Sequence, residues 1–344
     1  MRALAREFQL SGVTLFKRNI EAPEQVAELS HDLQTLAAEL PLWVAVDQEG
    51  GRVARLRAPF TEWPPMATLG RSGDPQLAYR FAAALASELR AVGITLDYAP
   101  VLDIHTNPKN PVIGDRALGA DAATVAQLGA AIVRGLQDNG IAACGKHFPG
   151  HGDTSVDSHL ALPLVEQPPD RIRRVECVPF REAIRHDVAF IMTAHVLVPS
   201  FDEQRPATLS PAIVRGLLRE ELDFNGVILS DDLDMKAITG SYTAPEAAVQ
   251  AIAAGCDGVL LCRELTKDHP HDADAHAAVL EALIHAVEDG RIPLTRAEDA
   301  LARNRRAKER FLAAPVASGG GPQLRHVLGS DEHRRIADEM ARFL

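Results

Sequence analysis

The stretch IAACGKHFPGHGDTSVDSH, residues 141–159, contains a short apolar run that is followed at once by a dense group of polar side chains. A proline and two glycines at residues 149, 150 and 152 cannot continue a helix or a central strand, so we expect the polar part to be a loop. Loops that a rigid scaffold holds are where binding and catalytic groups concentrate. The segment is therefore predicted to be a strand end that carries the chemistry of the protein.

The same arrangement of an apolar run and a polar end recurs along the chain. The apolar runs lie at residues 13–16, 42–46, 94–101, 141–144, 188–193, 227–229 and 258–261. Amphipathic segments such as 75–92 and 122–139 lie between them, and strands that alternate with helices indicate parallel βαβ units. Polar residues follow the runs, namely Arg18, Asn19, Asp47, Asp103, Lys146, His147, His195 and Asp231. Polar groups at that end of every strand are typical of the active site of a (β/α)8 barrel.

The predicted fold is therefore α/β, a (β/α)8 TIM-type barrel in a single domain over residues 1–315. Only seven strand candidates can be counted, so the barrel is expected to lack its first strand or to have an altered one. Residues 316–344 are expected to form a flexible break, SGGGP, and a C-terminal helix that packs on the barrel.

Composition restricts the class of protein. The chain has 344 residues, 46% of them hydrophobic, and a formal net charge of −11, which argues against a nucleic-acid or anionic-membrane partner because such proteins concentrate Lys and Arg. No run approaches the roughly 18 apolar residues of a membrane span, and the N-terminus lacks the apolar core of a signal peptide. Four cysteines without C-x-x-C spacing are expected to be reduced core residues. We expect a cytoplasmic protein without membrane insertion.

Asp47 opens the segment DQEGGRVARLR at a strand end. Its carboxylate can accept hydrogen bonds from sugar hydroxyls, and Arg55 can donate to them, although for this segment alone an ion-paired turn is the slightly favoured interpretation. In the rigid loop NPKNPVIGDRALG, Arg116 is the one obvious residue to face a ligand, and otherwise it is a surface arginine in a structural loop. Lys146 and His147 follow a buried strand, where their side chains are expected to diverge and to suit hydroxyl or anion binding.

The second half of the polar loop pairs a carboxylate with a histidine. Asp157 can reach the imidazole of His159, fix its tautomer and favour its charged form, which makes the pair a candidate general acid/base. A local turn with a solvated histidine is the simpler interpretation. A metal site formed by His147, His151, Asp153 and His159 is a third, but the Pro and Gly residues between them prevent the i, i+4 helical geometry of zinc proteases. We interpret those Pro and Gly residues as a hinge.

Three carboxylates, Asp231, Asp232 and Asp234, follow the apolar strand in GVILSDDLDM. Grouped carboxylates are costly unless something at that place needs negative charge. Asp231 still lies at the strand end, so we assign the chemistry to it and expect Asp232 or Asp234 to cap the next helix or face solvent. His195 either lines the same pocket or is a core histidine whose ring nitrogens are both bonded.

The motifs KHFPGHGDTSVDSH, VDQEGGRVARLR, NPVIGDR, PATLSP and ILSDDLDM together resemble glycoside hydrolase family 3, specifically its bacterial β-N-acetylglucosaminidases of peptidoglycan recycling. The similarity runs from about residue 12 to residue 262. It implies a single (β/α)8 barrel that needs no metal or cofactor. By this resemblance Asp231 is the nucleophile, and His159 is the general acid/base with Asp157 as its partner. The resemblance also assigns five ligands of the N-acetylglucosamine ring, namely Asp47, Arg55, Arg116, Lys146 and His147.

The resemblance predicts a retaining exo-β-N-acetylglucosaminidase that releases terminal N-acetylglucosamine from peptidoglycan-derived muropeptides through a covalent glycosyl enzyme. A histidine acid/base repels anions less than a carboxylate does, so the sequence is also compatible with a phosphorylase that uses phosphate as acceptor. Three further functions are compatible with it: a family member acting on β-glycosides of a different sugar, a metal-dependent barrel hydrolase, and a non-catalytic carbohydrate-binding barrel.

Overall fold

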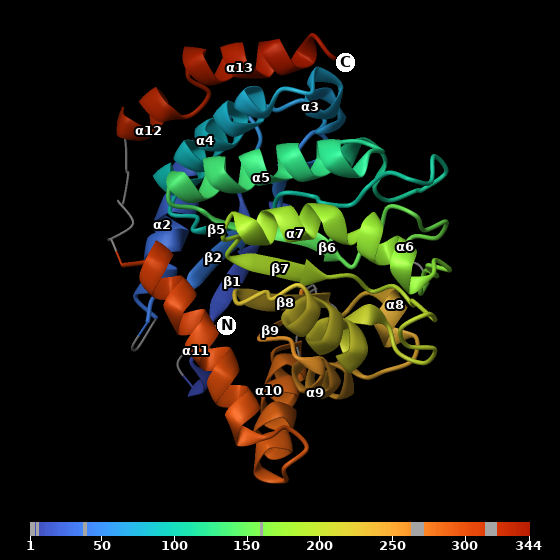
Figure 1. Cartoon of the computed structure of the whole chain (residues 1–344). Helices are drawn as coiled ribbons and strands as arrows, with labels where there is room; N and C mark the ends of the chain where they lie inside the picture. The colour runs from blue at the N-terminus through green and yellow to red at the C-terminus, as the bar shows by residue number, and fades with distance from the viewer. Residues whose placement is uncertain (1–3, 5–6, 37–39, 159–160, 263–271, 314–321) are drawn as a thin grey trace.

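A computed structural model of the chain describes residues 4, 7–36, 40–158, 161–262, 272–313 and 322–344. Its main sheet has seven parallel strands that follow one another in chain order (Figure 1). They are β1 (Gly12–Leu15), β2 (Trp43–Val46), β5 (Leu96–Asp97), β6 (Ala142–Phe148), β7 (Phe190–Thr193), β8 (Val227–Asp232) and β9 (Gly258–Leu260). Each of the seven apolar runs overlaps one of these strands, although β1 begins one residue before its run and β6 and β8 extend past theirs, so the predicted order of strands is confirmed.

Helices connect the strands and cover the outside of the sheet (Figure 1). The longer ones are α2 (Pro23–Gln34), α4 (Pro75–Ala91), α5 (Ala122–Asp138), α7 (Cys177–Arg185), the π-type helix Ala212–Glu221, α9 (Ala244–Ala254), α10 (Asp272–Glu288) and α11 (Leu294–Phe311). Short helices are α3 (Ala67–Ser72), α6 (Pro169–Arg174) and α8 (Lys236–Thr239). No helix in the described ranges combines the length and the apolarity that crossing a membrane requires.

The sheet is curled rather than flat. Trp43 on β2 and Phe190 on β7 have ring centroids 5.1 Å apart, although three strand spacings separate them, about 14 Å in a flat sheet. Both rings belong to an inner core to which every second residue of the central strands contributes. Helix α11 closes the side where the strands begin, because Leu312 packs on this core and Asn304 accepts a hydrogen bond from the Trp43 indole at 2.9 Å.

The two edges of the curled sheet approach each other. The Arg18 guanidinium, just after β1, donates to the carbonyl oxygen of Cys262, just after β9, at 3.3 Å. In the part of the chain that the structure describes, the sheet contains no eighth strand. The structure therefore has a single α/β domain with a seven-stranded curled sheet, and the complete eight-stranded barrel stays a prediction.

The C-terminal helices α12 (Pro322–Val327) and α13 (Asp331–Ala341) pack against the outer face of α4 (Figure 1). Glu339 forms an ion pair with Arg80 at 2.8 Å, and His333 bonds the buried carboxylate of Glu88 at 2.8 Å. Most of the predicted flexible break lies outside the described residues, and a domain boundary at residue 315 stays a prediction.

Candidate active site

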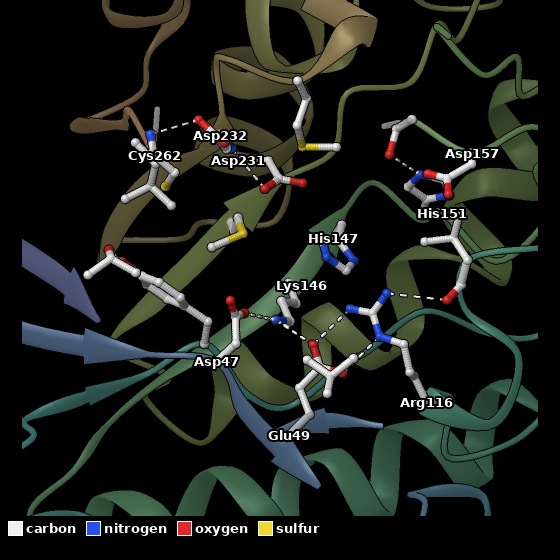
Figure 2. A pocket seen from close by; sticks show the side chains of 18 of the residues that line it. Asp47, Glu49, Arg116, Lys146, His147, His151, Asp157, Asp231, Asp232 and Cys262 are labelled. Carbon is white, nitrogen blue, oxygen red and sulfur yellow. Dashed lines mark hydrogen bonds and ion pairs between the residues drawn. The ribbon is translucent and has the colours of Figure 1, made fainter. Parts of the chain in front are cut away.

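A pocket of about 320 Å³ opens at the carboxyl ends of the strands. Seven of the eight residues that the sequence assigned to the site line it, namely Asp47, Arg55, Arg116, Lys146, His147, Asp157 and Asp231. Figure 2 labels all of them except Arg55. The eighth, His159, lies outside the described residues. Of the polar residues expected at successive strand ends, Asp47, Lys146, His147 and Asp231 meet in this pocket, whereas Arg18, Asn19, Asp103 and His195 are not among the residues that line it.

A chain of alternating charges forms one wall of this pocket. The Lys146 ammonium lies 2.8 Å from Asp47 Oδ1 and 2.6 Å from Glu49 Oε1. Arg116 holds Glu49 through two parallel hydrogen bonds of 2.7 and 2.8 Å (Figure 2). Arg55 contacts the other oxygen of Asp47 at 3.1 Å. Each cation thus touches a carboxylate, which holds all five groups in fixed positions.

Glu49 is the residue of this wall that sequence reasoning missed. It lies on β3 (Gln48–Gly50), which pairs with β4 (Val53–Ala54) in a small antiparallel sheet. Only 2% of its side chain is exposed. Burial raises the pKa of a carboxyl group, but the charges of Lys146 and Arg116 outweigh it and hold the pKa of Glu49 well below its usual range. The i, i+2 spacing from Asp47 was a signal, because such residues of an extended segment share a face.

Arg116 is more buried than predicted, and more of its N–H groups are hydrogen-bonded within the protein. Two of its N–H groups go to Glu49, and its side chain is 10% exposed. It lines the pocket, as the ligand-facing interpretation requires, whereas a side chain this buried is not the surface arginine of the alternative interpretation. Asp47 and Lys146 lie closer to one another than the sequence could indicate, and burial alone would lower the pKa of Lys146. The neighbouring Asp47 and Glu49 charges instead raise that pKa, so Lys146 is positively charged.

Lys146 and His147 both line the pocket, although adjacent strand residues were expected to diverge. The pairing of β6 with β7 shifts register between Lys146 and Phe148, which breaks the regular alternation of side chains. The His147 ring bonds through Nδ1 to Asp103 Oδ2 at 2.7 Å. A carboxylate can only accept, so Nδ1 carries the proton and Nε2 is left for the pocket. Burial, the largest single cause, raises the pKa of Asp103, but the interactions with His147 and His151 together outweigh it, so the pKa is lowered.

Asp231 and Asp232, at the end of β8, are adjacent carboxylates with opposite pKa shifts. Burial raises the pKa of Asp231, yet the nearby His195, His147 and Lys146 and the Asp232 amide lower it below the ordinary value. Burial raises the pKa of Asp232 to about 6. At neutral pH Asp231 is therefore the more fully ionised of the two.

The expected helix-capping role of Asp232 or Asp234 is wrong. Helix α8 begins at Lys236 after Met235, and no side chain caps it. Asp232 Oδ1 instead accepts two backbone amides, from Asp234 and Cys262, both at 3.0 Å, and so joins the end of β8 to the end of β9. The Asp232 carboxylate is thus bonded within the tight turn after β8 and does not reach the first amides of α8.

His195 is a core histidine. Its side chain is fully buried, Nε2 donates to the carbonyl oxygen of Asp232 at 2.9 Å, and Nδ1 bonds Thr208 Oγ1 at 2.8 Å. Of the two interpretations, the structure favours the one in which both ring nitrogens are bonded.

The described residues contain no group of three or more His, Cys, Asp or Glu side chains that could hold a metal ion. The two ring nitrogens of His151 bond hydroxyl groups of Thr154 and Ser158 instead. Cys144, Cys177 and Cys256 are free and buried, as expected, whereas Cys262 is free but only partly buried and lines the pocket.

Residues 1–307 match the N-terminal domain of glycosyl hydrolase family 3. The chain belongs to this family. The family 3 assignment and the enzyme class, a glycoside hydrolase, are thus confirmed. A β-hexosaminidase from Thiobacillus denitrificans is 43% identical over 278 residues, which cover 79% of this chain and 75% of the relative.

Solved structures of family 3 enzymes have the same fold. A β-N-acetylglucosaminidase from Paenibacillus sp. superimposes with a TM-score of 0.91 at 43% identity, over 99% of this chain and 64% of that one. NagZ from Neisseria gonorrhoeae gives a TM-score of 0.79 at 33% identity, over 97% and 90%. This family 3 chain therefore spans less than two thirds of the Paenibacillus protein and most of the Neisseria one.

Proposed function

We propose that the chain is a retaining β-N-acetylglucosaminidase, with Asp231 as nucleophile and His159, paired with Asp157, as general acid/base. The observation that carries the proposal is the position of Asp231, an ionised carboxylate in a pocket of about 320 Å³ among hydroxyl-binding groups. The names of the relatives support the sugar: they are a β-hexosaminidase and a β-N-acetylglucosaminidase.

In the first step Asp231 attacks the anomeric carbon, the bond to the leaving oxygen breaks, and protonated His159 gives its proton to that oxygen. In the second step neutral His159 removes a proton from water, and the water oxygen displaces Asp231 from the anomeric carbon. The low pKa of Asp231 suits the first step, because a nucleophile must be ionised. The raised pKa of Asp232, about 6, makes that neighbour the poorer candidate.

The charged wall suits a sugar ring. Asp47 offers carboxylate oxygens to hydroxyl groups, while Lys146, Arg55 and Arg116 offer donors, and His147 presents Nε2. Because the ion pairs fix these groups before a ligand arrives, little side-chain entropy is lost on binding. The five residues are therefore proposed as ligands of the N-acetylglucosamine ring.

Peptidoglycan-derived muropeptides are the proposed natural source of the terminal sugar, and a cytoplasmic location stays a prediction. The second candidate is phosphorolysis, which the neutral imidazole of the proposed acid/base favours because it repels phosphate less than a carboxylate would.

The test begins with Asp231→Ala, which should abolish turnover of an aryl β-N-acetylglucosaminide. A fluorinated slow substrate should label Asp231 in a mass spectrum; a label on Asp232, or full activity without Asp231, would refute the assignment. His159→Ala should lose more activity with poor leaving groups than with good ones. Comparison with an aryl β-glucoside tests the sugar, and the products from a muropeptide disaccharide with and without phosphate identify the acceptor.

A further inference from the structure

His151 has a buried imidazole that the proposed mechanism does not use. Its exposed fraction is 2%. The ring lies between two hydroxyl groups of its own loop, with Nδ1 2.8 Å from Thr154 Oγ1 and Nε2 3.0 Å from Ser158 Oγ. Its two hydrogen bonds therefore link Thr154 to Ser158, the residue that directly follows Asp157.

The protons of this contact can be assigned. Burial, the largest cause, lowers the pKa of His151, so the ring is neutral and has one donor and one acceptor. Thr154 Oγ1 lies 3.0 Å from the His151 carbonyl oxygen and donates to it, while the Asn110 amide donates to Thr154 Oγ1 at 3.1 Å. The ring then donates from Nδ1 to Thr154 and accepts at Nε2 from Ser158. This arrangement satisfies every polar group of the contact.

The backbone from which the ring projects is fixed. The His151 amide donates to Asp103 Oδ1 at 2.6 Å. A Cβ on Gly152 would lie 1.8 Å from the Ile104 carbonyl oxygen, and one on Gly150 would lie 2.9 Å from Glu176. The two glycines thus allow close packing at this place, where the sequence had suggested a hinge.

The far end of the loop reaches the proposed nucleophile side of the pocket. The Ser158 carbonyl oxygen accepts from the amide of Ala237 at 3.2 Å, in helix α8 just after the strand that carries Asp231. The Asp157 carbonyl oxygen accepts from the amide of Ala161 at 3.1 Å. The place of the loop relative to Asp231 therefore depends on how Ser158 is held.

We propose that His151 is a positioning residue whose imidazole clamps Thr154 to Ser158 and so sets the place of Asp157, the proposed partner of the acid/base His159, in the pocket that Asp231 also lines. This role rests on the proposed function of that pair. Its structural part, that the ring holds the loop, does not require any activity.

The experiment compares four single variants of the full chain. His151→Phe keeps a ring and removes both hydrogen bonds, Ser158→Ala removes one, and His151→Gln keeps one donor and one acceptor. The control is Ser155→Ala, in an exposed position of the same loop. Amide exchange at Ala161 and Ala237 reports the loop, and turnover of aryl β-N-acetylglucosaminides with good and poor leaving groups reports the proton transfer.

We expect amide exchange at Ala237 to rise about tenfold in His151→Phe and roughly threefold in Ser158→Ala, from the worth of one or two hydrogen bonds. In His151→Phe, turnover of the substrate with a poor leaving group should fall at least about tenfold more than turnover of the one with a good leaving group, with little change in KM. His151→Gln should lose less turnover than His151→Phe. The clamp would be overturned if amide exchange were unchanged in both His151→Phe and Ser158→Ala. It would also be overturned if Ser155→Ala changed amide exchange and turnover as much as His151→Phe does. If the unmodified chain hydrolyses no aryl N-acetylglucosaminide, the proposed function fails, and the exchange rates still decide the clamp.

Discussion

The substitution Glu49→Gln tests whether the charged wall of the pocket is held by its buried carboxylate. Glu49 lies 2.6 Å from the Lys146 ammonium and 2.7 Å from the Arg116 guanidinium, and both its side chain and that of Lys146 are 2% exposed. Removing one partner of a buried ion pair costs about 3–5 kcal/mol, because the remaining charge stays buried. Glutamine keeps a carbonyl acceptor, and Lys146 keeps Asp47, so we expect a loss at the low end of that range.

The assay is urea unfolding followed by the fluorescence of the two tryptophans. The matched control is Glu221→Gln, which removes the charge from an exposed ion pair with Arg173 and should cost under about 1 kcal/mol. If Glu49→Gln lowers the free energy of unfolding no more than the control does, the conclusion that this carboxylate holds the charged wall is refuted.

The lowered pKa of Glu49 also predicts how its contribution to the free energy of unfolding changes with pH. Its folded pKa is lowered from the ordinary 4.5, so its stabilisation is fully present above about pH 4.5 and is lost as the pH falls through the folded pKa. The difference in unfolding free energy between the unmodified chain and Glu49→Gln should therefore stay constant from about pH 8 to about pH 5.5 and shrink in more acidic solution. A difference that grows on acidification would contradict the assignment.

Three further perturbations test the positioning role of Asp103, the close packing at Gly152 and the need for a metal ion. Asp103→Asn should lower kcat/KM about 10- to 100-fold, because the His147 ring loses its charged partner, while far-UV circular dichroism stays unchanged; unaltered kinetics would exclude this role. Gly152→Ala should destabilise the fold by about 2–3 kcal/mol in urea unfolding, since the new Cβ would lie 1.8 Å from the Ile104 carbonyl oxygen, whereas Gly216→Ala, with its nearest atom at 3.8 Å, should change stability by under about 1 kcal/mol. EDTA should leave the turnover of an aryl β-N-acetylglucosaminide unchanged, and loss of activity that zinc restores would favour a metal-dependent hydrolase.

The strands were predictable because the sheet is covered on both faces. Parallel strands buried on both sides appear in the sequence as continuous apolar runs, and all four residues of β2, Trp43–Val46, are buried. The pair β3 and β4 was missed for the opposite reason. The segment Gln48–Gly50 is buried yet polar, so no hydrophobic pattern marks it. Its burial depends on ion pairs with residues distant in the chain.

The sequence could predict that Asp47, Lys146 and Asp231 lie at the same end of the sheet, but it could not predict which charged side chains pair with one another. Strand order alone brings Asp47, Lys146 and Asp231 to one end of a parallel sheet. The bond between Lys146 and Asp47 joins residues 99 positions apart, and that between Arg116 and Glu49 spans 67. Nothing local to either residue encodes such a partner. The ion pair of Arg55 with Asp47, eight positions away, was one of the two interpretations of its segment, whereas the pairing of Arg116 with Glu49 was not expected.

The choice between Asp231 and Asp232 shows what the fold adds to the motif. Apart from the family resemblance, the residues themselves favoured Asp231 only because it comes first after the apolar run. Two adjacent carboxylates in one pocket are not both ionised cheaply, so something must separate their pKa values. The cationic groups near Asp231 come from other strands: Lys146 and His147 from β6, and His195 from the segment after β7. Asp232 accepts two amide hydrogen bonds, yet burial dominates and its pKa rises. The ionisation of the proposed nucleophile is thus determined by neighbouring strands rather than by its own, and a substitution on β6 that removes the Lys146 charge should raise the pKa of Asp231 without touching it.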